Sequence, residues 1–257
     1  DIQRSRGLGD VYKRQVYLTE NRIPKIEISI HLPTDFDDSI WPMLGWLIGD
    51  LSPNKIPLVT GLEMTSPSDD NLKALCAAFG TTSAAPMLHI NGHTPGKVYS
   101  IPSKLKNFNI TKKHLAKLWN KFNYADLRVD LVAIGSPHAS LTECQSFVKF
   151  FDGKNCNPNV KTIITIGRDI LSKAKSEGLV EKITSAGVQI ISDICWCSIT
   201  EPIFPPEASV IMTNSGKYAH YAHGLTGRKT RFGSLKDCAI AAQSGWAKSE
   251  LPDWLSN

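Results

Sequence analysis

The chain has 257 residues, of which 42% are hydrophobic and 21% charged, and its net charge is +5. A chain of this length and composition buries a substantial core as one large globular domain or two modest ones. No apolar run is long enough to cross a bilayer, and no basic stripe with interleaved aromatic residues marks a nucleic-acid surface. We therefore expect neither a membrane nor a nucleic acid as a partner.

The six cysteines are scattered and too sparse for a disulfide scaffold. No secretory signal precedes them, and no CxxC pair indicates a zinc ribbon. These features favour a reducing, cytoplasmic location. The first fifteen residues, DIQRSRGLGDVYKRQ, are polar and lack apolar periodicity. We expect them to be a non-native or disordered scar without core contacts, with a natural surface extension as the alternative.

The first half of the chain shows strand and helix patterns in turn. Alternating apolar and polar residues predict a strand at Lys25–Leu32. A helix is predicted at Ser39–Gly49, and a second at Ser68–Phe79, which opens with a serine cap and acidic residues in its first turn. A short apolar segment predicts a strand at Ala85–Ile90. The segment Thr94–Lys106 is rich in proline and glycine, which indicates a connector.

The second half is more regular. Strands are predicted at Leu127–Ile134, Val160–Ile166, Val188–Ile194 and Ala208–Met212. Helices are predicted at Ser140–Phe151, Arg168–Ala186 and Leu235–Ser244. Gly187 and Gly245 suit the C-terminal caps of the last two helices. Strands that alternate with helices indicate parallel βαβ units and an α/β fold. We divide the chain into an N-terminal part at residues 16–125 and an α/β C-terminal part at residues 126–257.

Polar segments follow three of these strands, and in open parallel sheets ligands bind beyond the carboxyl ends of the strands. The first segment is Gly135–Ser140. Ser140 and Glu143 have the spacing of a capping box, so a helix cap explains both. Capping does not explain Ser136 and His138, and we take these two as candidate site residues.

The second segment is Asp193–Cys197, with the sequence DICWC. A free cysteine more often packs in the core than binds a metal. Here, however, two cysteines, an aspartate and a tryptophan gather at a strand end, and alternation would point Cys195 and Cys197 to one side. A thiolate at this position could bind iron, although composition alone gives that interpretation the smaller weight.

The third segment is Met212–Tyr221, which is dense in hydroxyl, amide and ammonium groups. Ser215 or Thr213 could cap a short helix, and Lys217 could be an ordinary surface charge. Such density is costly to place without a polar ligand, so a site for an anion or carboxylate is an equally weighted hypothesis.

The order of these motifs resembles the large subunit of the aconitase X family. The matching segments are Trp41–Gly45, Pro57–Glu63, Asp70–Leu75, Phe79–Pro86, His89, Thr94–Pro95, Gly135–Ser140, Asp193–Cys195 with Pro202, Thr213–Tyr221, Arg231–Ser234 and Cys238. Many members carry cysteine where Ser136 stands, and Asp-Thr-Cys is commoner than the Asp-Ile-Cys at Asp193–Cys195. The family's N-terminal section and its small swivelling domain are absent from this sequence, so we expect an N-terminally truncated chain.

The resemblance implies a hydro-lyase with an aconitase-like α/β core, an iron or iron–sulfur cofactor, and the small swivelling domain or subunit as a partner. Two activities are known in the family, the dehydration of cis-3-hydroxy-L-proline to Δ1-pyrroline-2-carboxylate and the dehydration of mevalonate 5-phosphate. The segments Cys195–Pro202 and Tyr218–Tyr221 are more similar to the hydroxyproline type. The basic residues Arg228, Lys229 and Arg231 keep the phosphate substrate as an alternative, and an inactive fragment or binding protein is another.

The resemblance also implies roles for the motif residues. Ser215 is the candidate base, by similarity to the serine base of aconitases, and Lys217 is the group that would activate it. His138 is the candidate acid. Because an enediolate gathers charge on the carboxylate, cationic and amide donors are needed to hold it.

Three further positions are the expected substrate contacts, Ser136, Thr213 and Asn214, and Lys217 would join Asn214 in binding the carboxylate. Cys195 is the expected iron ligand. Because clusters usually need three or four protein ligands, we expect the isolated chain to be inactive and to bind iron weakly.

Overall fold

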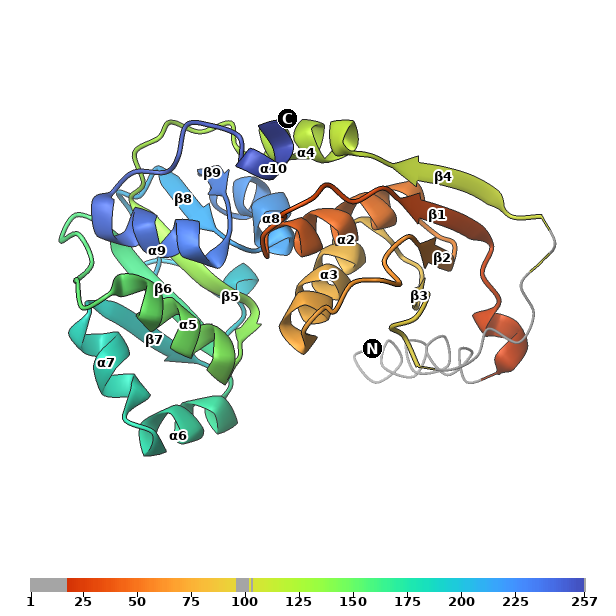
Figure 1. Cartoon of the computed structure of the whole chain (residues 1–257). Helices are drawn as coiled ribbons and strands as arrows, with labels where there is room; N and C mark the ends of the chain where they lie inside the picture. The colour runs from red at the N-terminus through yellow and green to blue at the C-terminus, as the bar shows by residue number, and fades with distance from the viewer. Residues whose placement is uncertain (1–17, 96–101, 103, 257) are drawn as a thin grey trace, which may run out of the picture.

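The computed structural model describes residues 18–95, 102 and 104–256. These residues form two parallel β-sheets, each with its own helices (Figure 1). Within the described residues, no helix combines the length and apolar character that crossing a membrane requires. Residues 1–15 lie outside the described ranges, so the expectation about that segment stays a prediction.

The first sheet has four parallel strands in the order β3-β2-β1-β4. Its strands are β1 (Ile26–Ile30), β2 (Pro57–Thr60), β3 (His89–Ile90) and β4 (Lys106–Ile110). Its helices are α2 (Ile40–Leu51), α3 (Asp69–Thr82) and α4 (Lys112–Phe122), and the short 3-10 helix η2 (Thr19–Arg22) precedes β1. The side chains of Ile26, Ile28 and Ile30 are buried while those between them are half-buried, as the alternation in the sequence predicts.

The second sheet has five parallel strands in the order β7-β6-β5-β8-β9. They are β5 (Leu131–Ala139), β6 (Lys161–Ile166), β7 (Val188–Ser192), β8 (Val210–Thr213) and β9 (Lys229–Phe232). The helices are α5 (Leu141–Phe151), α6 (Arg168–Ser176), α7 (Leu179–Ser185), η3 (Trp196–Ser198), α8 (Gly216–Thr226), α9 (Leu235–Ser244) and α10 (Asp253–Ser256).

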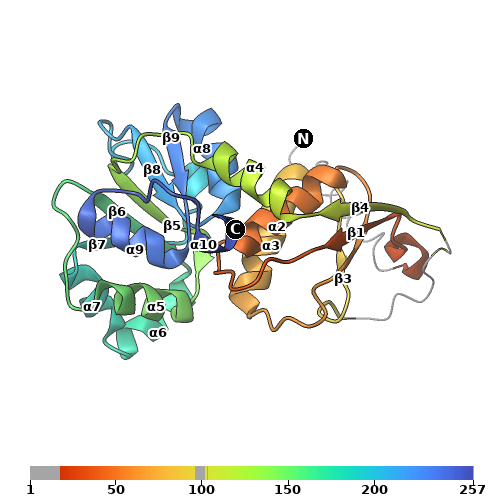
Figure 2. The ribbon, with the colours of Figure 1, turned by 45° about the horizontal axis from the view of Figure 1, so that its top comes forward.

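Helices cover both faces of the second sheet. Val132 and Ile134 of β5 pack in a core with α5, α7 and α9. The alternate residues, Leu131 and Ala133, pack in a second core with Trp196 and the buried side of α8. The α2 and α3 helices lie between the two sheets in both views (Figures 1 and 2). The fold therefore places α8 between the second sheet and the helices of the first.

The strand order creates a topological switch point. From β5 the chain passes to β6 and β7 on one side, then returns to β8 and β9 on the other. The carboxyl ends of β5 and β8 therefore adjoin, and in parallel α/β sheets this is where ligands bind. Two of the three predicted polar segments follow these two strands.

The α/β class and the parallel sheets are confirmed, as are the helices predicted at Ser39–Gly49, Ser68–Phe79, Ser140–Phe151 and Leu235–Ser244. The single helix predicted at Arg168–Ala186 is wrong. Gly178 has a left-handed φ of 65°, which ends α6 and starts α7. The strand predicted at Ala85–Ile90 is reduced to its last two residues. The first strand of the second half begins later than predicted and runs on to Ala139.

Several elements escaped the sequence patterns, namely β2, β4, α4, α8, β9 and α10. The division at residues 125 and 126 stays a proposal. The two sheets fall on either side of it, but Trp254 and Leu255 at the C-terminus pack in the core of the first sheet.

Candidate active site at the switch point

The carboxyl end of β5 bends at Gly135, which has a left-handed φ of 99°. A Cβ atom there would overlap the carbonyl oxygen of Thr165 on β6, so only glycine fits. The Thr165 hydroxyl donates to the Gly135 carbonyl at 2.6 Å, which ties the bend to the neighbouring strand. The pairing of β5 with β6 is irregular between Ile134 and Ala139, and this irregular stretch carries Ser136 and His138.

The end of β8 is joined to this bend by Ser215. The Ser215 hydroxyl accepts from the Tyr218 backbone N–H at 3.0 Å as the N-cap of α8, and it donates to the Ser136 carbonyl. The structure therefore shows the capping role that was one of the two interpretations of Ser215. The Thr213 hydroxyl donates to the Ala133 carbonyl at 2.8 Å and accepts from the Ser215 N–H at 3.2 Å. Thr213 is fully buried, so the structure places it behind Ser215 and not in reach of a substrate.

The segment after β7 reaches the same edge of the sheet. The Lys217 Nζ lies 3.8 Å from the Cys195 Sγ. The next residue, Trp196, is buried, donates its indole N–H to the Ile134 carbonyl at 2.8 Å, and packs its ring 5.3 Å from the Tyr218 ring. The structure thus brings Ser136, Cys195 and Ser215 together, as we expected from their positions after parallel strands.

His138 is half-buried, and its Nε2 lies 3.0 Å from the Ile194 carbonyl oxygen. Because a carbonyl only accepts, Nε2 carries the hydrogen in this contact, and Nδ1 is the other ring nitrogen for chemistry. Asn214 is also half-buried and lines a cavity of about 300 Å³ together with Asp70 and Glu143. Asp193 is directed elsewhere, since its carboxylate accepts from the backbone N–H and the side chain of Arg168 at the start of α6.

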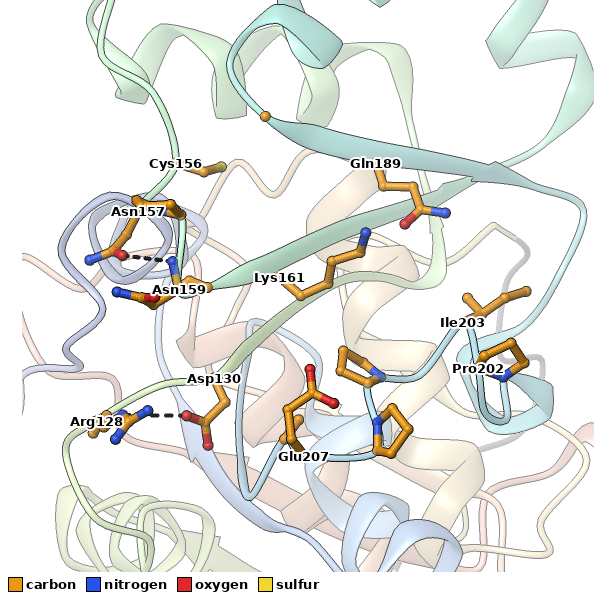
Figure 3. Close-up of a pocket in the computed structure, with 16 residues that line it drawn as sticks. Arg128, Asp130, Cys156, Asn157, Asn159, Lys161, Gln189, Pro202, Ile203 and Glu207 are labelled. Carbon is orange, nitrogen blue, oxygen red and sulfur yellow. Dashed lines mark hydrogen bonds and ion pairs between the residues drawn. The ribbon is translucent and has the colours of Figure 1, made fainter.

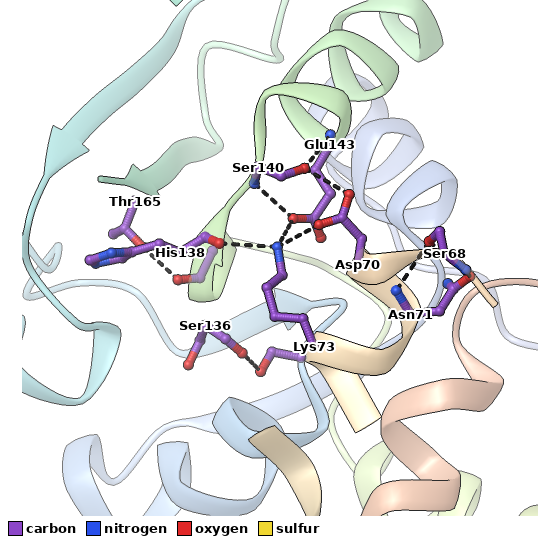
Figure 4. A network of polar contacts seen from close by, with 11 residues as sticks. Ser68, Asp70, Asn71, Lys73, Ser136, His138, Ser140, Glu143 and Thr165 are labelled. Atoms are coloured by element: carbon purple, nitrogen blue, oxygen red, sulfur yellow. Dashed lines mark hydrogen bonds and ion pairs between the residues drawn. The ribbon is translucent and has the colours of Figure 1, made fainter. Parts of the chain in front are cut away.

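A charged network beside His138 was not predicted. Lys73 of α3 contacts the Asp70 and Glu143 carboxylates at 2.7 and 2.5 Å and donates to the His138 carbonyl at 3.2 Å (Figure 4). The Ser140 hydroxyl donates to Asp70 at 2.7 Å. Ser140 and Glu143 form the predicted capping box at the start of α5. The network therefore links a helix of the first sheet to the polar end of the second.

Burial and charge act in opposite directions on this network. Burial raises the pKa of Glu143 even though the Lys73 ammonium opposes the shift. For Asp70 burial also acts upward, but the hydrogen bonds from Lys73 and Ser140 outweigh it and lower the pKa. Burial would lower the pKa of Lys73, but the two carboxylates together raise it. The Glu143 side chain is the more buried of the two acids, which is why its pKa moves the other way.

The donors near Cys195 fit iron in kind but not in number. Cys195 and Cys197 are soft thiol ligands of the type that iron accepts. The hydroxyls of Ser136 and Tyr218 are buried without a hydrogen-bond partner among the described residues, so each can still accept or donate one bond. Over the same residues, no three histidine, cysteine, aspartate or glutamate side chains are arranged to hold a metal ion. This chain's described part therefore supplies a corner of an iron site.

The basic residues that kept a phosphate substrate in consideration are engaged elsewhere. Arg228 donates to the carbonyl oxygens of Ala208, Pro206 and Thr226 at 2.6 to 3.0 Å. Arg231 is buried, and its guanidinium donates to the carbonyl oxygens of Asn123, Ala125 and Lys248. Both guanidinium groups therefore hold loops together, and neither is free to form the predicted phosphate cluster.

A cavity of about 960 Å³ lies at the opposite edge of the second sheet (Figure 3). It is lined by residues at the amino ends of the strands, among them Asp130, Lys161 and Gln189. None of the predicted site residues lines it. Since ligands of open parallel sheets bind at the carboxyl ends, the switch point remains the candidate active site.

The fold and this site define an α/β protein whose polar groups gather at the carboxyl ends of a parallel sheet. Residues 24–120 match the family model of the aconitase X second domain, and residues 129–244 match that of the aconitase X third domain. The chain belongs to the aconitase X family, and the resemblance inferred from its motifs is confirmed.

Curated relatives fall into two groups. A cis-3-hydroxy-L-proline dehydratase of Pseudomonas aeruginosa is 36% identical over 246 residues, which cover 93% of this chain and 42% of the relative. The enzyme of the same name from Hypocrea jecorina is 36% identical over 239 residues, covering 90% of this chain and 40% of the relative. A phosphomevalonate dehydratase large subunit of Methanocaldococcus jannaschii is 27% identical over 227 residues, covering 86% and 55%.

The solved structure of Thermococcus kodakaraensis aconitase X in its holo-form has a similar fold, with a TM-score of 0.78 and 27% identity. The match covers 88% of this chain and 56% of that one. This chain spans about two-fifths of the length of the hydroxyproline dehydratases that it matches.

Proposed function

We propose that this chain forms the second and third domains of a hydro-lyase that dehydrates cis-3-hydroxy-L-proline to Δ1-pyrroline-2-carboxylate. The observation that carries the proposal is the 36% identity over 246 residues to a dehydratase of that name, against 27% for the phosphomevalonate dehydratase subunit. The engagement of Arg228 and Arg231 with backbone carbonyls supports the same choice, because a phosphate substrate calls for free cationic donors.

The reaction removes the proton at Cα and the hydroxyl at C3, and charge grows on the carboxylate as the enediolate forms. Lys217 and Asn214 stand in the first turn of α8 and in the loop before it, and in the proposal they hold this carboxylate. Iron bound at Cys195 would supply a Lewis acid for the departing hydroxyl. The half-burial of Lys217 limits the screening of its charge by water.

Ser215 is the proposed base and His138 the proposed acid. For Ser215 to accept the Cα proton, its hydroxyl must leave the Ser136 carbonyl and lose its own proton, and the nearby Lys217 ammonium favours the resulting alkoxide. His138 keeps its Nε2 on the Ile194 carbonyl and, as an imidazolium, would donate from Nδ1 to the leaving hydroxyl. Ser136, whose hydroxyl is unpartnered among the described atoms, is the proposed substrate contact.

The small swivelling domain implied by the resemblance is the proposed partner, and a cytoplasmic location is proposed from the six free cysteines. The test is a hybrid enzyme in which residues 24–244 of this chain replace the matching segment of the P. aeruginosa relative. Circular dichroism establishes that the hybrid folds. It should release water from cis-3-hydroxy-L-proline and leave mevalonate 5-phosphate unchanged. Turnover of the phosphate alone, or of neither compound by a folded hybrid, would contradict the proposal.

A further inference from the structure

Two thiols, Cys195 and Cys197, stand at the carboxyl edge of the second sheet beside α8. They are half-buried, whereas Cys144 and Cys238 are fully buried in the core around α5 and α9. Trp196 between them is anchored by its hydrogen bond to the Ile134 carbonyl and by its packing on Tyr218. Because this anchor fixes the short helix η3, the backbone that carries both thiols is held against α8.

The two sulfurs face the same cation. Lys217 Nζ lies 3.8 Å from Cys195 Sγ. Burial and then the adjacent Cys195 thiol raise the pKa of Cys197, while the Lys217 ammonium opposes that shift, so the cation is close to both thiols. Two neighbouring sulfurs beside a fixed ammonium are arranged to be held as thiolates by a metal.

A buried hydroxyl completes this arrangement. Tyr218 is fully buried, and its hydroxyl has no hydrogen-bond partner among the described residues. Burial raises the pKa of Tyr218 above its usual range, and the Cys197 and Cys195 thiols contribute to the shift. An unpaired buried hydroxyl costs about 1–3 kcal/mol, and a metal-bound thiolate in front of it would supply the missing acceptor.

We propose that Cys195 and Cys197 together form a two-thiolate corner for a sulfur-ligated metal centre, with Cys197 as a second ligand beside the one implied by the family resemblance. Each thiol releases one proton when its sulfur binds the metal, so a bound metal displaces two protons. The inference rests on the proposed function in one respect, since iron or an iron–sulfur cluster is the occupant expected in the complete enzyme. Its remaining ligands would come from groups other than these two cysteines.

The test uses Cd²⁺ as the probe and this chain as it is, in reduced form. Cd²⁺ prefers thiolate ligands, and the cadmium–sulfur charge-transfer absorbance counts the bonds that form. We expect one Cd²⁺ per chain. Cys197→Ser and Cys195→Ser should each remove about half of the absorbance and weaken binding by about tenfold or more, since even the loss of an outer-shell partner costs that much.

Cys156→Ser is the matched control, because Cys156 is also a half-buried free thiol but lies at another edge of the sheet. It should bind Cd²⁺ as the wild type does. Cys197→Ala serves as a second variant, and thermal melts establish that each protein folds. Wild-type binding by Cys197→Ala, an equal loss in Cys156→Ser, or no cadmium–sulfur absorbance in the wild type would each overturn the inference. Because no turnover is measured, these outcomes are independent of the hybrid-enzyme test.

Discussion

Lys73→Met is expected to weaken the junction between the two sheets. The ammonium of Lys73 contacts Asp70 at 2.7 Å, Glu143 at 2.5 Å and the His138 carbonyl at 3.2 Å. Methionine has a similar volume but leaves the two carboxylates facing each other without a cation. The side chains of Lys73, Asp70 and Glu143 are 30%, 22% and 19% exposed, so water screens the repulsion only in part.

The expected loss in the free energy of unfolding is about 2–3 kcal/mol at pH 7. Exposed ion pairs contribute up to about 1 kcal/mol, and removing one partner of a fully buried pair costs about 3–5 kcal/mol, so this half-buried network lies between. Lys73 helps to lower the pKa of Asp70 below 3.8, which stabilises the fold above that pH and ceases to do so as the pH falls. Burial raises the pKa of Glu143 above 4.5, so its ionised form costs stability at neutral pH, and more so without Lys73. Both effects make the loss fade below about pH 4.

Urea denaturation of the wild type, Lys73→Met and Lys73→Arg at pH 7 and pH 4 measures this effect. Lys73→Arg keeps the charge and should recover most of the loss. The control is Lys248→Met, which also removes a lysine 2.7 Å from a carboxylate, that of Asp237, but one whose side chain is 62% exposed. The control should lose at most about 1 kcal/mol. The reasoning is refuted when Lys73→Met loses no more than Lys248→Met, or loses as much at pH 4 as at pH 7.

Three further predictions follow from the site and its surroundings. Ser215→Ala in the hybrid enzyme should lower kcat by roughly 10²–10⁴-fold if Ser215 is the base, beyond the loss of about 1 kcal/mol expected for its N-cap, whereas Lys217→Ala should raise KM and lower kcat together; near-normal kcat per folded enzyme in Ser215→Ala would leave only the cap. Asp38→Asn should stabilise the chain by about 1 kcal/mol at pH 8 and by nothing at pH 3: burial raises the pKa of Asp38 from 3.8 to about 6, its ionisation therefore opposes folding above that range, and the full shift of about 3 kcal/mol is reduced because the residue reaches solvent; an unchanged midpoint of urea unfolding at pH 8 would contradict this. Gly135→Ala should cost about 3 kcal/mol because its Cβ overlaps the Thr165 carbonyl, against about 1 kcal/mol for Gly153→Ala, which shares a left-handed φ but meets open space; equal losses in thermal melts would show that the overlap is relieved at no cost.

The local signals in the sequence were read correctly where the physical cause is itself local. The Ser140–Glu143 capping box and the Gly245 cap lie within one helical turn of the elements that they bound, so spacing alone predicts them. The same holds for the alternation of β1. The helix predicted at Arg168–Ala186 failed because Gly178 can either continue a helix or end it, and only the packing of α6 and α7 decides which.

The sequence by itself determined the α/β class, the family and the three polar segments that follow parallel strands, because these depend on short-range patterns and on the order of motifs. Only the tertiary structure decided which groups in those segments remain available for chemistry. Lys73 meets Glu143 seventy positions away, and Ser215 meets the Ser136 carbonyl seventy-nine positions away. Such contacts depend on the strand order β7-β6-β5-β8-β9, which local spacing does not encode. The same order buries Thr213 behind Ser215 and brings Lys217 to Cys195, because it sets the ends of β5 and β8 side by side.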